Sequence, residues 1–380
     1  MKSISGEHSP WFIKKYKQML YSVTIKLFIV YQGLLMEYRK LGNTGLDISL
    51  IGLGTMTWGW QNTLEEGFEQ MDYALERGIN FFDTAEMYAI PPSPERFGTT
   101  ETIIGHWFKA RGNRDKVILA SKMTGPGLPW VREGQKINKE NILKAVEGSL
   151  SRLQTDYIDL YQLHWPNRGS YHFGKTWDFA PQFDVQAERD NFLEVLHTMQ
   201  GLINEGKIRH IGLSNETAWG LTNWLQVAKD ENLPRMASIQ NEYSLLCRHF
   251  EQDLSEITMH ENCGLLAWSP LARGILSGKY LNGAKPEGAR LTLETRAEHR
   301  VGQQVDNATQ KYMDVANRFG LDPCQMALAF VNRQTFVSST LIGATSMEQL
   351  RSNIDSISVT LSEEVLKEIQ TIRREYPQPF

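Results

Sequence analysis

Short apolar runs alternate along the chain with stretches whose apolar residues recur at helical spacing, and the alternation continues from residue 48 to the C-terminus. Leu64, Phe68, Met71 and Leu75, for example, share one face of a helix that ends before Gly78. The apolar runs predict strands over 48–53, 79–83, 117–122, 157–164, 208–213, 236–240, 265–268 and 339–342. The amphipathic stretches predict helices over 64–77, 99–109, 142–153, 191–204, 217–228, 251–260, 307–319, 347–354 and 362–374.

This regular alternation indicates an α/β protein with a parallel sheet covered by helices. Eight strand–helix units predict a closed (β/α)8 TIM barrel, and no polar linker divides the chain, so residues 36–380 are expected to form a single domain. The segments 165–186 and 271–305 are too long for ordinary connections. Both follow predicted strands and therefore leave the C-terminal face of the barrel, where they are expected to cover a ligand.

Composition narrows the class of protein. The 380 residues carry a net charge of −4, which disfavours a nucleic-acid partner. The three cysteines show no paired spacing and fit a reducing compartment, so a cytoplasmic location is expected. Residues 1–35 have a basic flank, but their apolar run is interrupted by Lys26 and no small-residue cleavage site follows. We expect a leader, a disordered extension or residues that are not native there, rather than a signal peptide or membrane anchor.

Polar and ionisable residues follow the predicted strands, where a barrel gathers them at one end. Asp83, Lys122 and His164 end three successive strands, and Tyr88 lies just beyond Asp83. A phenol is a weak acid with a pKa near 10, and a nearby ammonium lowers that pKa. Lys122, held by Asp83, is therefore expected to make Tyr88 a general acid toward a substrate carbonyl, with His164 orienting the same oxygen. No side chain supplies a hydride, so this chemistry requires a nicotinamide cofactor.

The motifs at these positions resemble those of the aldo-keto reductase family, and most closely its bacterial Tas-type group. The resemblance covers roughly residue 37 to the C-terminus. It is carried, in family order, by Gly-Leu-Gly-Thr-Met at 52–56, Asn-Phe-Phe-Asp-Thr-Ala-Glu-Met-Tyr at 80–88, Ser-Lys at 121–122, Leu-His-Trp at 163–165, Gly-Leu-Ser-Asn at 212–215, Gln-Asn-Glu-Tyr-Ser at 240–244, Trp-Ser-Pro-Leu-Ala-Arg-Gly at 268–274 and Ile-Gly-Ala-Thr at 342–345. Tyr-Leu-Asn-Gly-Ala-Lys-Pro at 280–286 is shared with the Tas-type group.

The resemblance implies NADPH-dependent reduction of aldehydes or ketones. Asp83, Tyr88, Lys122 and His164 match the family's catalytic residues. The positions that match its cofactor site fall into five sets: Gly54, Thr55 and Met56 at the first strand; Ser214, Asn215 and Gln240 at the carboxamide; Trp268 stacked on the nicotinamide; Ser269, Pro270, Leu271, Ala272, Arg273, Lys279 and Arg290 at the phosphates; and Gly343, Thr345, Gln349 and Asn353 at the adenosine end. The basic residues of the fourth set favour NADPH over NADH.

Several alternatives remain open at this stage. The barrel could be a cofactor-binding regulatory subunit with little catalysis, although such potassium-channel subunits have Asn where this chain has His164. A barrel metal hydrolase is disfavoured because the strand ends lack the His-x-His and carboxylate clusters that a metal needs, and no metal site is predicted. Trp268 could simply be a core residue. The Gly-Leu-Gly segment at 52–54 is only a weak match to the glycine-rich fingerprint of dinucleotide-binding proteins, and we interpret it as close backbone packing.

The partner is expected to be a small-molecule carbonyl compound rather than a membrane or a nucleic acid; its identity and the oligomeric state are not readable. The opening of the barrel is expected to be rich in aromatic residues, which suggests a substrate with an apolar body. These residues are Trp58 and Trp165, with Trp177 and Phe179 in the long loop. His172 and the aromatic residues of that loop could equally well only pack the loop.

Overall fold

The computed structural model describes residues 36–181, 184–294 and 299–380. Predictions for residues 1–35 lie outside this part of the chain. The described residues form a short antiparallel hairpin followed by a closed barrel of parallel strands. The hairpin joins β1 (Tyr38–Lys40) to β2 (Asp47–Ser49). The barrel order is β10-β3-β4-β5-β6-β7-β8-β9, which confirms the predicted (β/α)8 fold.

The eight barrel strands run in chain order around the barrel, and the last pairs with the first. Their bounds are β3 (Ile51–Gly54), β4 (Phe81–Asp83), β5 (Ile118–Met123), β6 (Ile158–Leu163), β7 (Ile208–Ser214), β8 (Met236–Glu242), β9 (Gly264–Trp268) and β10 (Val337–Ile342). Every strand pairs in parallel with both neighbours, so all eight C-terminal ends lie at the same end of the barrel. The side chains that end these strands therefore meet in one place.

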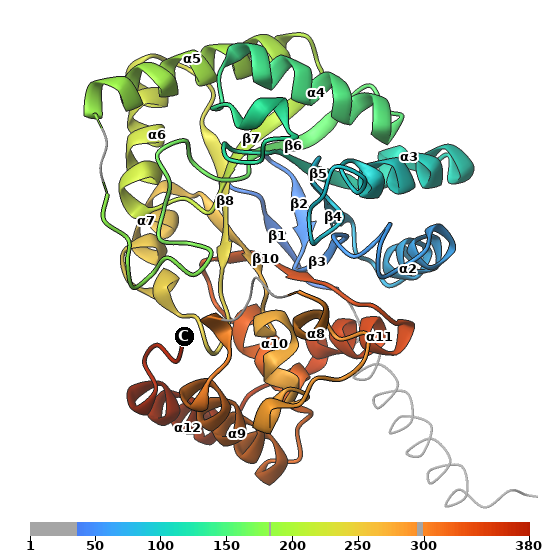
Figure 1. The fold of residues 1–380 in the computed structure, drawn as a ribbon, viewed down its shortest axis with the longest axis vertical. Helices are drawn as coiled ribbons and strands as arrows, with labels where there is room; N and C mark the ends of the chain where they lie inside the picture. Colours follow the sequence, from blue (N-terminus) through green and yellow to red (C-terminus); the bar gives the residue numbers. More distant parts are fainter. Residues whose placement is uncertain (1–35, 182–183, 295–298) are drawn as a thin grey trace, which may run out of the picture. The chain divides into compact units, whose positions relative to one another are not determined.

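Helices surround the strands (Figure 1). They are α2 (Leu64–Glu76), α3 (Thr99–Arg111), α4 (Lys139–Leu153), α5 (Val185–Asn204), α6 (Ala218–Asp230), α7 (Asp253–Glu261), α8 (Arg290–Leu293), α9 (Gln303–Arg318), α10 (Pro323–Asn332), α11 (Met347–Asp355) and α12 (Glu363–Glu375). Local sequence explains several starts: Thr63 and Glu66 form a reciprocal capping box at α2, and Asp322 caps α10 ahead of a proline in its first turn. Within the described residues, none of the helices has the length and apolar character needed to span a membrane.

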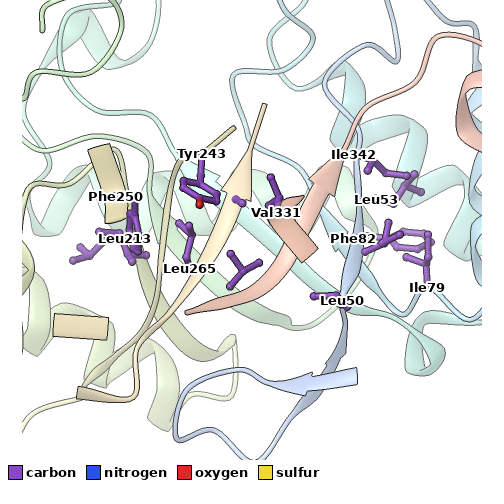
Figure 2. Packing of buried hydrophobic residues seen from close by; sticks show 14 of the residues in the cluster. Leu50, Leu53, Ile79, Phe82, Leu213, Tyr243, Phe250, Leu265, Val331 and Ile342 are labelled. Carbon is purple, nitrogen blue, oxygen red and sulfur yellow. The ribbon is translucent and has the colours of Figure 1, made fainter. Parts of the chain in front are cut away.

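Alternation along each strand divides the buried side chains between two cores. Phe82 packs between the strands and the helices, together with Leu53 and Leu265 (Figure 2). Its neighbour Phe81 faces the barrel interior, where it joins residues from the other strands and from the hairpin. Those interior residues are Leu41, Ile48, Phe81, Ala120, Leu160, Ala237, Leu266 and Leu341. Because Leu41 and Ile48 come from the β1–β2 hairpin, the hairpin closes the N-terminal end of the barrel.

Two element predictions were wrong. The run 48–53 is not one strand: Ile48 belongs to the hairpin, and the barrel strand starts at Ile51 after a bend. Both segments are apolar, because the hairpin strand closes the N-terminal end of the barrel and β3 is one of the barrel strands. Hydrophobicity alone therefore could not separate them. Helix α10 was not predicted, since every residue from Met326 to Asn332 is buried and the segment shows no amphipathic period.

The long connections also contain more structure than expected. Helix α5 begins at Val185, six residues before the predicted start at 191, with Asp184 as its cap. In the described part of the segment 271–305, 3-10 helices cover Ala272–Ser277 and Leu281–Gly283, α8 follows them, and α9 already begins at Gln303. Both connections nevertheless leave the C-terminal ends of strands, β6 and β9, as predicted.

Candidate active site

A cavity of about 850 Å³ opens at the C-terminal end of the barrel. Side chains two positions apart on a strand face the same way. The strand positions that point into the barrel are therefore apolar in its interior and polar at its C-terminal end. Phe81 is followed in this way by Asp83, Ala120 by Lys122, and Leu160 by Gln162. The alternation that builds the core thus also delivers the polar groups of the site.

Asp83 and Lys122 form an ion pair beneath the cavity. Lys122 Nζ lies 2.6 Å from Asp83 Oδ2 and also donates to the carbonyl oxygen of Thr84 at 2.7 Å. Lys122 is fully buried. Burial by itself lowers the pKa of Lys122, but the charges of Asp83 and Tyr88 and the hydrogen bonds to both together outweigh this effect, so the pKa is raised above its usual value. The ammonium is therefore held charged, as predicted.

Tyr88 lies next to this pair, on the segment that follows β4. Lys122 Nζ is 5.0 Å from the centroid of the Tyr88 ring, and the ring meets that of His164 edge-on at 5.8 Å. Burial raises the pKa of the Tyr88 phenol above 10, and the charge of Lys122 only partly opposes this. Lys122 thus lowers the pKa of Tyr88, as expected, but the cost of burying a phenolate outweighs the attraction of one ammonium, so the net shift is upward.

His164 lies at the end of β6 with its ring buried between Tyr88 and Trp165. Burial, followed by the nearby charge of Lys122, holds its pKa well below the usual value. The imidazole is therefore neutral near pH 7 and carries one N–H. Its Nδ1 atom is buried and has no hydrogen-bond partner among the described residues. A neutral ring in this position can donate one hydrogen bond to a ligand without adding charge.

Two glutamine amides hold the second oxygen of Asp83. Gln240 Nε2 donates to Oδ1 at 2.7 Å, and Gln162 Nε2 donates to the same oxygen at 3.2 Å. Gln240 Nε2 also donates to Gln162 Oε1 at 3.2 Å. Gln162 was not among the predicted site residues. Its position on β6, two residues before His164 and so on the same face of the strand, could have indicated it. The amide nitrogen of Gln240 is committed to Asp83 and Gln162 in this arrangement.

Ser214 and Asn215 stand beside this network at the end of β7. Asn215 Nδ2 donates to the carbonyl oxygen of His164 at 2.9 Å and to Ser214 Oγ at 3.0 Å. The amide oxygen of Asn215, in contrast, is buried without a hydrogen-bond partner in the described part of the chain. An unpaired buried acceptor is costly and calls for a donor. Asn215 has left-handed backbone (φ 52°), so its position is set by the turn that follows β7.

Trp268 ends β9 and lines the cavity, half-buried, so it is not simply a core residue. Phe173 stacks near it with a centroid distance of 6.3 Å and an interplanar angle of 20°. Gly54 lines the cavity at the end of β3, where a Cβ atom would come within 2.9 Å of the carbonyl oxygen of Ile342. The prediction of close backbone packing at the Gly-Leu-Gly segment is thereby confirmed, since Gly52 is equally crowded by Leu341.

The remaining predicted cofactor positions line the same cavity, with one exception. Those that line it are Thr55, Met56, Ser269, Pro270, Leu271, Arg273, Lys279, Arg290, Gly343, Thr345, Gln349 and Asn353. Ala272 does not line the cavity, because it is fully buried in the core under this loop, and its place in the cofactor site stays a prediction. Lys122 is likewise below the cavity rather than in its wall.

Glu294 was missed, and it changes the charge of the loop after β9. Its Oε2 accepts from Arg273 Nη1 at 3.4 Å and from Arg290 Nε at 3.3 Å. Both of these arginines are thus paired, whereas Lys279 makes no ion pair within the described residues. Cys324, at the start of α10, lines the same end of the cavity. Among residues 36–181, 184–294 and 299–380, no three His, Cys, Asp or Glu side chains are grouped so that they could hold a metal ion.

The predicted aromatic mouth is only partly correct. Trp165 lines the cavity, but Trp58 is fully buried behind the wall, where its Nε1 donates to Gln70. Phe173 and His172 line the cavity from the long loop, while Trp177 is 70% exposed and Phe179 packs on Tyr171. Other apolar residues that line the cavity are Met87, Ile90 and Leu128.

The barrel, the cavity and the four side chains of Asp83, Tyr88, Lys122 and His164 together define a class of protein, and the sequence comparisons agree. Residues 50–374 match the aldo/keto reductase family, and the chain belongs to that family. It is 48% identical over 351 residues to Protein tas of Escherichia coli, which covers 90% of this chain and 99% of that protein. It is also 33% identical over 350 residues to the uncharacterized oxidoreductase YrpG of Bacillus subtilis (90% and 97%), and 40% identical over 257 residues to an aldo-keto reductase of Babesia bovis (63% and 88%).

Proposed function

We propose that this oxidoreductase converts aldehydes or ketones to alcohols with NADPH as reductant and Tyr88 as proton donor. The observation that carries the proposal is the arrangement of four side chains at the closed end of the cavity. The buried Asp83–Lys122 pair lies beneath the Tyr88 ring, and His164 meets that ring from the side. An acid, a charge that stabilises its conjugate base and a neutral hydrogen-bond donor are thus gathered around one point.

The residues around that point fit a nicotinamide group. The orphaned Asn215 amide oxygen needs a donor, and a carboxamide NH2 is such a donor. Trp268 offers an aromatic face, and Gly54 leaves space where a side chain would collide with β10. When bound, the cofactor supplies the hydride that no side chain can provide. At the far end of the cavity, Ser346 caps α11, and its N-terminus favours a phosphate group.

The protein's own part in the reaction is the transfer of one proton. As the carbonyl carbon gains hydride, its oxygen gains negative charge, and the phenol of Tyr88 donates its proton to that oxygen. The O–H bond of Tyr88 breaks, the alcohol O–H forms, and the resulting phenolate is stabilised by the charge of Lys122. His164 donates a hydrogen bond from its neutral ring and so orients the carbonyl. Water then reprotonates Tyr88.

The cavity also supports a substrate class and a cofactor preference. Met87, Leu128, Trp165 and Phe173 form apolar walls on the Tyr88 side, which suit an aldehyde or ketone with an apolar body. Lys279, which has no carboxylate partner within the described residues, is available for a 2′-phosphate and supports NADPH over NADH. All three cysteines are free thiols, which agrees with the cytoplasmic location that we propose.

The proposal is tested by following NADPH consumption with 4-nitrobenzaldehyde for the wild type and for Tyr88→Phe. Consumption by the wild type that is lost in Tyr88→Phe, while NADPH binding persists in both, supports a reductase with Tyr88 as its acid. A wild type that binds NADPH tightly but consumes none with a wide panel of carbonyl compounds would instead identify a regulatory subunit. A Tyr88→Phe variant with full activity would require another proton donor.

A further inference from the structure

Of the four residues Asp83, Tyr88, Lys122 and His164, Tyr88 is the one that does not lie at the end of a strand. It lies five residues beyond Asp83, on a turn outside the strands in which its N–H donates to the carbonyl oxygen of Ala85 at 3.1 Å. The position of its phenol relative to Lys122 therefore depends on whatever holds this segment. A displacement of about 1 Å in a reacting group can cost on the order of 100-fold in rate, so that support matters for the chemistry.

Glu86 ties this segment to the strand that carries Lys122, whereas the N–H groups of Ala89 and Ile90 bind the carbonyl oxygens of Arg96 and Met56. Glu86 is 1% exposed, and each of its polar groups is tied to a neighbouring element. Its backbone N–H donates to the carbonyl oxygen of Lys122 at 3.1 Å, and its own carbonyl accepts from Gly98 N at 2.8 Å. Its carboxylate accepts from Thr124 N at 2.6 Å. Glu86 thus joins the Tyr88 segment to the end of β5, where Lys122 lies.

Arg132 completes this connection with a two-point ion pair. Its Nη1 donates to Glu86 Oε2 at 2.9 Å and its Nη2 to Oε1 at 2.5 Å. Both groups are largely buried, with side-chain exposures of 15% and 1%. A buried ion pair stabilises a fold little compared with an apolar pair of similar volume, so its presence points to a requirement for fixed geometry. Arg132 itself has left-handed backbone (φ 46°), a conformation that a non-glycine residue adopts only when its surroundings impose it.

The segment 124–134 that carries Arg132 also reaches the other side of the site. Trp165, which follows His164, donates from Nε1 to the carbonyl oxygen of Pro126 at 3.0 Å. Leu128 packs in the same apolar cluster as Tyr88 and Trp165. One segment therefore contacts both the Tyr88 side and the His164 side of the reaction centre.

We propose that Arg132 is a positioning residue, which fixes the Tyr88 phenol opposite Lys122 and His164 through its ion pair with Glu86. The proposal rests on the proposed function of Tyr88 as the acid. Arg132 touches neither the cavity nor the reacting atoms, so its effect is exerted through Glu86. The bidentate geometry of guanidinium explains why arginine suits this position better than lysine.

The test compares Arg132→Met, Arg132→Lys and Glu86→Gln with the control Arg114→Met. Arg114 forms a similar buried pair with Asp159 at 2.7 Å, but at the opposite end of the barrel. We expect kcat to fall about 10- to 100-fold in Arg132→Met, less in Arg132→Lys, and not in Arg114→Met when rates are referred to folded protein. The Kd for NADPH stays unchanged in all of them.

A second readout needs neither turnover nor cofactor. With ring-13C tyrosine, the Tyr88 resonance is assigned by its loss in Tyr88→Phe, and it is expected to shift in Arg132→Met and Glu86→Gln but not in Arg114→Met. An unchanged Tyr88 resonance, or a loss of kcat that Arg114→Met matches, overturns the proposal. If the wild type reduces no carbonyl compound, the proposed function fails, and the resonance alone still decides whether Arg132 positions Tyr88.

Discussion

Lys122 Nζ and Asp83 Oδ2 lie 2.6 Å apart, and both side chains are buried, so neither charge can be removed alone at low cost. Lys122→Met leaves the Asp83 carboxylate buried without its counter-ion. We expect the free energy of unfolding to fall by about 3–5 kcal/mol, measured by urea denaturation. The double variant Lys122→Met/Asp83→Leu should recover part of that loss, and equal stabilities of the single and double variants would contradict this explanation.

Tyr88 determines the alkaline limit of reduction. The phenol must be protonated to act as the acid, and burial raises its pKa above 10. The value of kcat/KM for reduction should therefore persist to pH 10 and fall only above it. Because the charge of Lys122 lowers this pKa, residual activity in Lys122→Met should extend to still higher pH. A decline centred below pH 9 in the wild type would show that another group controls the rate.

Asn215 is expected to contribute to cofactor affinity through its unpaired oxygen. Asn215→Leu removes that acceptor and should weaken NADPH binding about 5-fold, since one hydrogen bond contributes roughly 1 kcal/mol. The measurement is a fluorescence titration with NADPH. Asn223→Leu, on the outer helix α6, is a suitable control. Unaltered affinity in Asn215→Leu would mean that the orphaned oxygen is not a cofactor contact.

Lys279 should discriminate between the two nicotinamide cofactors. Arg273 and Arg290 share Glu294, whereas Lys279 has no carboxylate partner within the described residues. Lys279→Met is expected to weaken NADPH binding roughly 10-fold while the Kd for NADH changes little, since a lost charge-assisted hydrogen bond is worth about 1.5 kcal/mol or more. Titrating both cofactors decides the matter: an equal loss for both would place Lys279 at a phosphate that they share.

His172 makes the fold sensitive to acid. Its side chain is buried against Ser170, and burial lowers its pKa to about 3. Because the pKa in the folded state lies below that of the unfolded chain, the stability that it contributes is present above pH 6.5 and is lost as the pH falls toward 3. His172→Asn should flatten the decrease in unfolding free energy between pH 7 and pH 4. The exposed His260→Gln is the control, and identical pH dependence in both variants would contradict the prediction.

Local sequence patterns determined most of what was predicted about this protein. Strand periodicity and helix caps depend on near neighbours, so the barrel and the strand-end positions of Asp83, Lys122 and His164 could be read directly from the sequence. The predicted secondary structure was wrong where a segment is buried on all sides, as in α10. It was also wrong where two adjacent segments are apolar for different reasons, as at Ile48 and Ile51.

Only the tertiary structure decided which partners those residues meet. Gln162 and Gln240 converge on Asp83, Glu294 pairs with Arg273 and Arg290, and Arg132 reaches Glu86 from a segment 46 residues away. These contacts join different strands and loops, and hydrogen bonds between distant segments leave no periodic trace in the sequence. The raised pKa of Tyr88 belongs to the same group, because the balance between the burial of its phenol and the charge of Lys122 depends on how the barrel closes around both.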